Sequence, residues 1–229
     1  MEIWKGEWLI GIPVLIIGDS GSGKTASLRN FKNNEVGIFN VAGKPLPFRN
    51  NLKKMDNVSY DQIKKGLKVG KVKSYIIDDS QYLMAFESFN RAKETGYNKF
   101  TDIAFNFEKL IEFIIKDIPE DYIVYFLHHT ETTESGKIKA KTLGKMLDTQ
   151  LTVEGLFSIV LLCKTDGKDH YFETQSDGYT TCKSPIEMFE FKIDNDLKMV
   201  DKTIREYYQL DKKEKEENAW YKSQEITMK

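Results

Sequence analysis

Residues 13–26 decide the fold, and they are Pro13-Val14-Leu15-Ile16-Ile17-Gly18-Asp19-Ser20-Gly21-Ser22-Gly23-Lys24-Thr25-Ala26. The apolar run at 13–17 predicts a strand of a parallel sheet that is covered on both faces. Residues 18–25 match the GxxxxGK[ST] pattern of a phosphate-binding loop at every position. A helix is predicted over 25–31. The alternative is a chance glycine-rich turn, and the strand before it and the helix after it argue against that alternative.

The chemistry of phosphate binding explains the residue types in this loop. Glycines allow backbone N–H groups to curve around a β-phosphate, and the start of a helix presents its positive end to the same anion. Lys24 would place a charge beside the β- and γ-phosphates, and the hydroxyl of Thr25 would bind Mg²⁺. The expected ligand is therefore ATP with Mg²⁺. The candidate binding residues are Gly18, Asp19, Ser20, Gly21, Ser22, Gly23, Lys24, Thr25 and Ala26.

Acidic and histidine side chains follow two further predicted strands. Residues 74–77 form an apolar run that ends at Asp78, which is predicted to bind Mg²⁺ together with Thr25. Asp79 could orient or activate an attacking water, with capping of the next helix as the alternative. His129 closes the predicted strand at 122–127 and is a candidate sensor of the γ-phosphate, with a structural histidine as the alternative. Lys24, Asp79 and His129 form the candidate catalytic set.

The rest of the chain alternates between strand and helix patterns. Apolar residues recur at helical spacing over 101–118, where Thr101 is the predicted cap. This alternation predicts one α/β domain over 1–210, with a mostly parallel sheet flanked by helices, and a charged tail over 211–229. The remaining predicted elements are strands at 36–41 and 156–163, a hairpin of 171–174 with 179–182, helices at 60–67 and 80–90, and a polar loop at 131–144.

Composition excludes several classes of protein. The chain has 229 residues and a net charge of −1, so its overall charge does not attract nucleic acid. The two cysteines lack the spacing of a zinc site or a disulfide framework. The polar first residues and the strand-length apolar runs predict a protein of the cytoplasm that does not span a membrane.

Two local segments are candidates for binding single-stranded DNA. Residues 44–73 carry nine basic and two acidic residues, a local charge of +7 that could displace counterions from a phosphate backbone. In residues 90–100, basic groups alternate with Tyr97 and Phe100, and aromatic rings suit the stacking of unpaired bases. A solvated basic surface, with the aromatic rings in the core, is the alternative for both.

Taken together, the motifs resemble the RecA-like ATPase core of the additional-strand class of P-loop proteins. They resemble more closely a family of compact phage-encoded ATP-binding proteins that includes single-strand annealing recombinases of the Sak-four type. The resemblance covers most of residues 10–210, and only the loop at 18–25 is specific by itself. The matching stretches are VLIIGDSGSGKTASL (14–28), YIIDDSQYL (75–83), GYNKFTDI (96–103), IVYFLHHTE (123–131), KIKAKTLGKMLD (137–148) and IDNDLKMVDKTIREYY (193–208).

This resemblance implies an Mg²⁺-dependent ATPase that acts on single-stranded DNA in phage-type recombination or strand annealing, inside a bacterial host. Its implied partners are further copies of the chain and a single-strand DNA-binding protein. The family also implies a basic residue that reaches the phosphates of a neighbouring subunit, and the candidates are Lys139, Lys141 and Lys145. One departure stands out. RecA carries a catalytic glutamate at the end of the strand that follows the helix after this loop, and here that strand ends Phe39-Asn40-Val41-Ala42-Gly43, without a carboxylate.

Two other functions remain open from the sequence. A nucleotide or nucleoside kinase would share the phosphate-binding loop. However, such enzymes commonly close arginine-bearing lids, and this chain has only four arginines. A non-catalytic module, in which ATP only organises an oligomer, is consistent with the missing glutamate.

Overall fold

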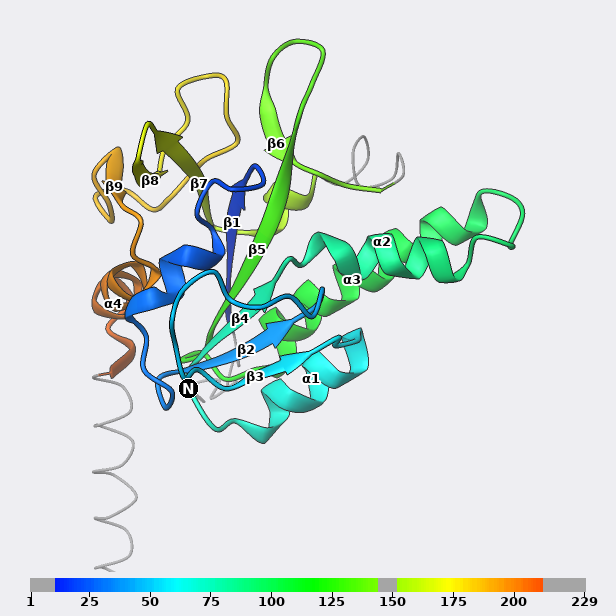
Figure 1. The fold of residues 1–229 in the computed structure, drawn as a ribbon, viewed down its shortest axis with the longest axis horizontal. Coiled ribbons are helices and arrows are strands. Elements are labelled where there is room, and N and C mark those ends of the chain that lie inside the picture. Colours follow the sequence, from blue (N-terminus) through cyan, green and yellow to red (C-terminus); the bar gives the residue numbers. More distant parts are fainter. Residues whose placement is uncertain (1–10, 144–151, 212–229) are drawn as a thin grey trace, which may run out of the picture.

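The strands of the protein form one mixed sheet of order β3-β2-β4-β5-β1-β7-β8-β9, with β6 paired to β5 (Figure 1). The structure is a computed structural model, and it describes residues 11–143 and 152–211. The strands are Ile12–Gly18 (β1), Val36–Asn40 (β2), Lys54–Asp56 (β3), Ser74–Asp78 (β4), Ile123–Thr132 (β5), Ile138–Ala140 (β6), Ile159–Asp166 (β7), Asp169–Glu173 (β8) and Lys192–Asp194 (β9). Strands β1 to β5 and β7 pair in parallel, whereas β6, β8 and β9 pair antiparallel.

Helices cover both faces of this sheet. The α-helices are Tyr60–Val69 (α1), Gln81–Asn90 (α2), Asn98–Asp117 (α3) and Leu197–Tyr208 (α4), and short 3₁₀ helices span Thr25–Asn30 (η1) and Val153–Leu156 (η3). Apolar side chains of α1, α2 and α3 pack on one face, and those of η1 and α4 pack on the other. Successive residues of β1, such as Val14 and Leu15, therefore enter opposite cores, which explains why the strand is apolar throughout. Within the described residues, no helix has the length and apolar character that crossing a membrane requires.

The register of the parallel strands brings the predicted site residues together at the carboxyl ends of the strands. Strand β5 lies between β1 and β4, and Gly18 at the end of β1 is paired with His129 in β5. Asp78 ends β4 opposite Asn40, the last residue of β2. Because the carboxyl ends of parallel strands share one edge, the loop after β1 and the two acids after β4 lie together there.

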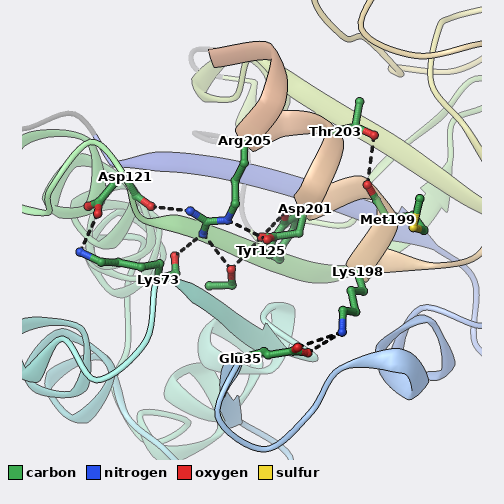
Figure 2. Close-up of polar contacts among 10 residues, drawn as sticks. Glu35, Lys73, Asp121, Tyr125, Lys198, Met199, Asp201, Thr203 and Arg205 are labelled. Atoms are coloured by element: carbon green, nitrogen blue, oxygen red, sulfur yellow. Dashed lines mark hydrogen bonds and ion pairs between the residues drawn. The ribbon is translucent and has the colours of Figure 1, made fainter. Parts of the chain in front are cut away.

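Near the amino ends of β4 and β5, a buried polar network holds α4 against the sheet (Figure 2). Asp201 on α4 accepts hydrogen bonds from Ser74 Oγ at 2.8 Å and from Tyr125 Oη at 2.9 Å. Arg205, one helical turn later, donates from Nε to Asp201 Oδ2 at 2.8 Å. The guanidinium also donates to two backbone carbonyls that precede β4 and β5, at 3.0 and 3.1 Å. Each polar group of this network therefore has a partner.

Several sequence-based predictions of helices are confirmed. The helix at 60–67 is α1, which begins with a capping box between Ser59 and Gln62 and ends at Gly70 in the left-handed conformation. The helix at 80–90 is α2. The apolar stripe predicted for 101–118 is buried in α3, and Pro119 follows the helix as expected.

The helix predicted over 25–31 forms over 25–30, as a short 3₁₀ helix. Other predictions are wrong. Helix α3 begins at Asn98, so Thr101 lies inside it and does not cap it. The hairpin of 171–174 with 179–182 does not form, because β8 pairs with β7 and β9. The polar loop at 131–144 contains the end of β5 and all of β6. Lys145 and the tail over 212–229 lie outside the described residues.

Candidate functional site

A cavity of about 440 Å³ lies at the carboxyl ends of the parallel strands, over the glycine-rich loop 18–25. Strands β1, β4 and β5 each supply part of its wall where they end. The loop after β2 and the start of β8 supply the remainder. The lining residues are Ser20, Gly21, Gly23, Lys24, Thr25, Ala26, Lys44, Pro45, Pro47, Asp78, Asp79, His129 and His170.

The glycine-rich loop has a backbone suited to an anion. Gly21 and Gly23 have φ angles of +81° and +100°, which side-chain-bearing residues rarely adopt. Within the described residues, the N–H groups of Gly21, Gly23 and Lys24 have no hydrogen-bond acceptor. Such donors in a concave turn attract negatively charged oxygens. The site therefore fits a phosphate group on grounds of backbone geometry.

Lys24 is folded back into this loop. Its ammonium donates to the carbonyl oxygens of Gly18 at 2.7 Å and Asp19 at 2.9 Å. Burial lowers the pKa of Lys24 below its ordinary value, while nearby anions such as Asp79 partly counteract that effect. The cation is thus held by two neutral acceptors next to a cavity. An incoming anion would offer it a stronger, charged partner.

Thr25 and Asp78 meet directly, although 53 positions separate them. Thr25 Oγ1 donates to Asp78 Oδ1 at 2.8 Å. Burial raises the pKa of Asp78 to about 6, and the hydrogen bond from Thr25 opposes this rise. A hydroxyl and a carboxylate are hard oxygen ligands of the kind that Mg²⁺ prefers. The described residues contain no cluster of three or more His, Cys, Asp or Glu that could hold a metal alone, so oxygens of a bound phosphate and water would complete its coordination.

Asp79 adopts a left-handed backbone conformation, with φ at 58°. Its carboxylate lies 2.7 Å from Lys44 Nζ, and its other oxygen lies 3.2 Å from His129 Nε2 in a geometry that falls short of a hydrogen bond. Burial alone would raise the pKa of Asp79, but the neighbouring His129 and Lys44 outweigh it and lower the pKa to about 2. Because Ser80 is the residue that precedes α2 and the carboxylate contacts side chains, the helix-cap alternative is not supported.

The two histidines at the end of β5 differ in environment. His128 is buried, with Nδ1 2.8 Å from Ser80 Oγ and Nε2 2.7 Å from the carbonyl oxygen of Lys141. Burial lowers the pKa of His128 to about 4, so the ring is neutral at physiological pH. His129 lines the cavity and makes an edge contact with the ring of Tyr82. The structure therefore gives His128 a structural role and leaves His129 beside the candidate site.

Sequence reasoning missed three side chains of this site. Lys44 was assigned to the basic segment, yet it pairs with Asp79. Thr130 donates to the carboxylate of Asp19, and His170 Nδ1 lies 2.7 Å from the carbonyl oxygen of Ser22. The position of Lys44, just after a strand that ends at the same edge, was a usable signal. His170 reaches the loop only because β8 folds back along β7, and no local pattern indicates that.

The candidate DNA-binding segments lie at two other places. Residues 44–73 form the sheet edge at β3 together with α1 (Figure 1). Residues 90–100 lie at the tip of an arm that α2 and α3 form together (Figure 1). Tyr97 at that tip is 89% exposed, so the alternative in which the aromatic rings pack in the core does not hold for Tyr97, whereas Phe100 is half-buried. Arg91 is held by three carboxylates and is not available to a phosphate.

The proposed trans-acting lysines have different surroundings. Lys139 pairs with Glu131 across the β5–β6 hairpin at 2.9 Å. The side chain of Lys141 is exposed, and its backbone N–H donates to the carbonyl oxygen of His129.

The geometry as a whole is that of an α/β protein with a mostly parallel sheet flanked by helices. Neither a protein-family model nor a curated protein sequence matches the chain.

Proposed function

We propose that this protein binds ATP with Mg²⁺ in the 440 Å³ cavity and hydrolyses it, as a RecA-like P-loop ATPase. The observation that carries the proposal is the 2.8 Å contact between Thr25 and Asp78. It joins the last position of the GxxxxGK[ST] pattern to an acid at the end of a different buried strand. A chance glycine-rich turn gives no reason for that pairing, whereas two side chains that share one Mg²⁺ ion must lie close together.

The strand order also supports this assignment. Strand β5 is inserted between β1, which carries the loop, and β4, which carries Asp78. One additional strand at this place is the feature after which the additional-strand class of P-loop proteins is named. The lysine, hydroxyl and carboxylate therefore occur on the arrangement of strands that the resemblance implies.

Each side chain has a proposed task in the reaction. Lys24 would neutralise the β- and γ-phosphate oxygens, and Thr25 with Asp78 would hold Mg²⁺, which supplies further positive charge at those oxygens. Asp79, with a pKa of about 2, is a weak proton acceptor, so we assign it the positioning of the attacking water. His129 would sense the γ-phosphate beside it. We expect slow turnover, because the end of β2 carries no carboxylate where RecA has a catalytic glutamate.

We further propose that the protein binds single-stranded DNA as a homo-oligomer and acts in phage-type recombination or strand annealing, in the bacterial cytoplasm, alongside a single-strand DNA-binding protein. Exposed Tyr97 at the tip of the α2–α3 arm supports base stacking. In the basic segment, Arg49, Lys53, Lys65 and Lys71 are exposed side chains that could contact phosphates. Lys139 or Lys141 would reach a neighbouring subunit's nucleotide.

A nucleotide or nucleoside kinase is less well supported by the geometry. Among the residues that line the cavity there is no arginine. Arg29 bonds to Asn195, and Arg91 and Arg205 bond to carboxylates, so three of the four arginines are already engaged away from the cavity. The non-catalytic module differs from the proposal only in lacking turnover.

One experiment separates these functions. Release of phosphate from ATP is measured with Mg²⁺, alone, with single-stranded DNA, and with candidate acceptor nucleotides. We expect slow release that single-stranded DNA stimulates. Transfer of phosphate to an acceptor would establish the kinase, and tight ATP binding without any release would establish the non-catalytic module. Anisotropy of a labelled oligonucleotide, with and without an ATP analogue at two salt concentrations, tests the coupling of ATP to DNA binding.

A further inference from the structure

A second cavity, of about 390 Å³, lies between the ends of β2 and β3 and the helices α1, α2 and α3. Its volume falls in the range of small-ligand sites, about 300–1,000 Å³. It mixes apolar walls with several amide, hydroxyl and carboxylate groups. We call it the Tyr60–Glu87 cavity, and its lining residues are Val41, Asn57, Val58, Ser59, Tyr60, Leu83, Phe86, Glu87, Asn90 and Asn106.

Two polar atoms of this cavity are buried without a partner. Tyr60 Oη and Glu87 Oε2 have no hydrogen bond within the described part of the chain. Burial raises the pKa of Tyr60 well above its ordinary value, and the charge of Glu87 adds to that rise. Leaving a buried donor or acceptor unpaired destabilises the folded protein, so native proteins seldom do it without a reason. A ligand that pairs with both atoms would remove this cost.

Hydrogen bonds to Oε1 of Glu87 leave Oε2 as the oxygen without a partner. Its Oε1 accepts from Asn106 Nδ2 at 2.8 Å and from Arg91 Nη1 at 3.2 Å. Arg91 is itself held by Glu94 and Asp102. The carboxylate is therefore held in place, and its free oxygen can only accept a hydrogen bond. The missing partner must carry an N–H or O–H group.

The apolar wall indicates what carries that donor. Phe86 is 42% exposed and stacks on Tyr82, with ring centroids 5.3 Å apart. Phe89, one turn further along α2, is 77% exposed, so aromatic surface continues from the cavity towards the tip of the arm. Exposed aromatic rings stack on unpaired bases, and a carboxylate accepts hydrogen bonds from the amino group of cytosine.

We propose that the Tyr60–Glu87 cavity binds a nucleobase with an exocyclic amino group, taken from a single DNA strand. Glu87 Oε2 accepts from the amino group, Tyr60 Oη donates to a ring nitrogen or carbonyl, and Phe86 stacks on the ring. The inference rests on the proposed function, because it names where that function reads a base. Thymine, which lacks the amino group, should bind less well.

A series of side-chain contacts connects this cavity to the phosphate site. Tyr82, which stacks on Phe86, also makes an edge contact with His129 and has Lys44 Nζ 4.8 Å from its ring centroid. Lys44 and His129 both neighbour Asp79. Three side chains, Phe86, Tyr82 and either Lys44 or His129, would therefore connect a base in the Tyr60–Glu87 cavity to Asp79, the group that would position the water. This proximity gives bound DNA a physical route to influence turnover.

The test compares Tyr60→Phe with Tyr207→Phe, which removes a hydroxyl from α4, at a distance from the cavity. Labelled oligo-dC and oligo-dT are titrated with each variant. We expect Tyr60→Phe to bind oligo-dC about 3- to 10-fold more weakly, with little change for oligo-dT, and Tyr207→Phe to bind both as the wild type does. Tyr60→Phe should also be at least as stable as the wild type, because it removes an unpaired buried hydroxyl.

Two further arms identify the base and its source. Glu87→Gln turns the free acceptor into a donor, so we expect weaker binding of oligo-dC and unchanged or stronger binding of oligo-dT. Free dCMP should compete poorly if the base comes from a strand. If dCMP binds with the same dependence on Tyr60, the site takes a nucleobase from a free nucleotide instead.

The inference is overturned if Tyr60→Phe and Tyr207→Phe behave alike with every ligand. That result would leave the proposed ATPase standing if turnover remains stimulated by DNA. Should the wild type neither release phosphate nor bind any oligonucleotide, the proposed function fails, and the dCMP arm still decides whether the cavity binds a base.

Discussion

Strands β4 and β5 have very different polar environments at their two ends. At the amino ends, Ser74 and Tyr125 belong to the network of Asp201 and Arg205, in which each polar group has a partner (Figure 2). At the carboxyl ends, Asp78 and Asp79 are adjacent acids whose pKa values, about 6 and about 2, lie on opposite sides of the ordinary value. Complete pairing at one end holds a helix in place. At the other end, within the described residues, His129 Nε2 and the N–H groups of Gly21, Gly23 and Lys24 have no hydrogen-bond partner and are open to a ligand.

The largest effect of a substitution should occur near the amino ends of β4 and β5, where each polar group of the network has a partner. Arg205→Ala leaves the buried Asp201 carboxylate without its cation, and breaking a buried pair in this way costs about 3–5 kcal/mol. The free energy of unfolding from urea titration measures this cost. Lys202→Ala is the matched control on the same helix, because its ion pair with Glu206 is exposed and should contribute less than about 1 kcal/mol. Equal losses in the two variants would contradict the contrast between the ends.

At the other end, we expect a loss of activity without a loss of stability. Lys24→Ala should slow ATP turnover about 10²- to 10³-fold, which corresponds to the loss of a charged contact in the transition state. Its free energy of unfolding should change by less than about 1 kcal/mol, because the buried ammonium only contacts carbonyl oxygens at the edge of the cavity. Lys202→Ala, which changes an exposed lysine of α4 away from the cavity, is again the control. Unchanged turnover in Lys24→Ala would remove the proposed phosphate site.

The two adjacent acids should respond to substitution with opposite signs. The pKa of Asp78 is raised in the folded state, so the folded protein holds the proton more tightly and stability falls as pH rises from 3.8 to about 6. Asp78→Asn should therefore stabilise the protein at pH 7.5 by about 1–3 kcal/mol while abolishing Mg²⁺-dependent ATP binding. In the wild type, that binding should weaken as pH falls through 6.

Substitution of Asp79 should change the free energy of unfolding in the opposite direction. Its pKa is lowered, so its contribution to stability is present above pH 3.8 and is lost as pH falls towards 2. Asp79→Asn should lower the free energy of unfolding at pH 7.5 by about 1 kcal/mol and slow turnover, while ATP binding persists. Urea titrations of both variants at pH 3.5, 5 and 7.5 test the pair. A stabilising Asp79→Asn would show that Lys44 and His129 do not hold the carboxylate.

The smallest effect is expected at the rim of the cavity. The Lys44 side chain is 57% exposed, so its pair with Asp79 should contribute less than about 1 kcal/mol to stability. A double-mutant cycle of Lys44→Ala with Asp79→Asn measures the coupling, which we expect at about 0.2–1 kcal/mol. No coupling would place Lys44 back among the solvated lysines of the basic segment.

Elements with a strong periodic pattern could be predicted from the sequence. The buried strands β1, β4 and β5 are continuous apolar runs, and α3 has an apolar stripe at helical spacing. Because parallel strands end at one edge, the nearness of the glycine-rich loop to Asp78 and His129 also followed from the sequence. Helix α4 was not predicted as an element, although Asp196 is a strong cap and Leu197, Val200 and Ile204 have helical spacing.

Features that depend on irregular backbone could not be predicted. The left-handed conformation of Asp79 has no local signal, and it aims the carboxylate at Lys44 and not at the helix. The false hairpin arose because 179–182 looks like a strand. In the structure, residues of the 180–183 segment form only isolated bridges, to Ile138 and Val160. Such long-range pairings depend on how the β5–β6 hairpin and β7 are placed, and no short window of sequence contains that information.

The central position of β1 has a consequence for protein synthesis. Both of its neighbours come much later in the chain, at Ile123–Thr132 and Ile159–Asp166. On the ribosome, this apolar strand therefore has neither partner until more than half of the protein has been made. Contacts between such distant segments slow folding and expose partly folded chains to aggregation. Nascent chains that end before β5 should consequently depend on chaperones, and the glycine-rich loop should acquire its shape only late in translation.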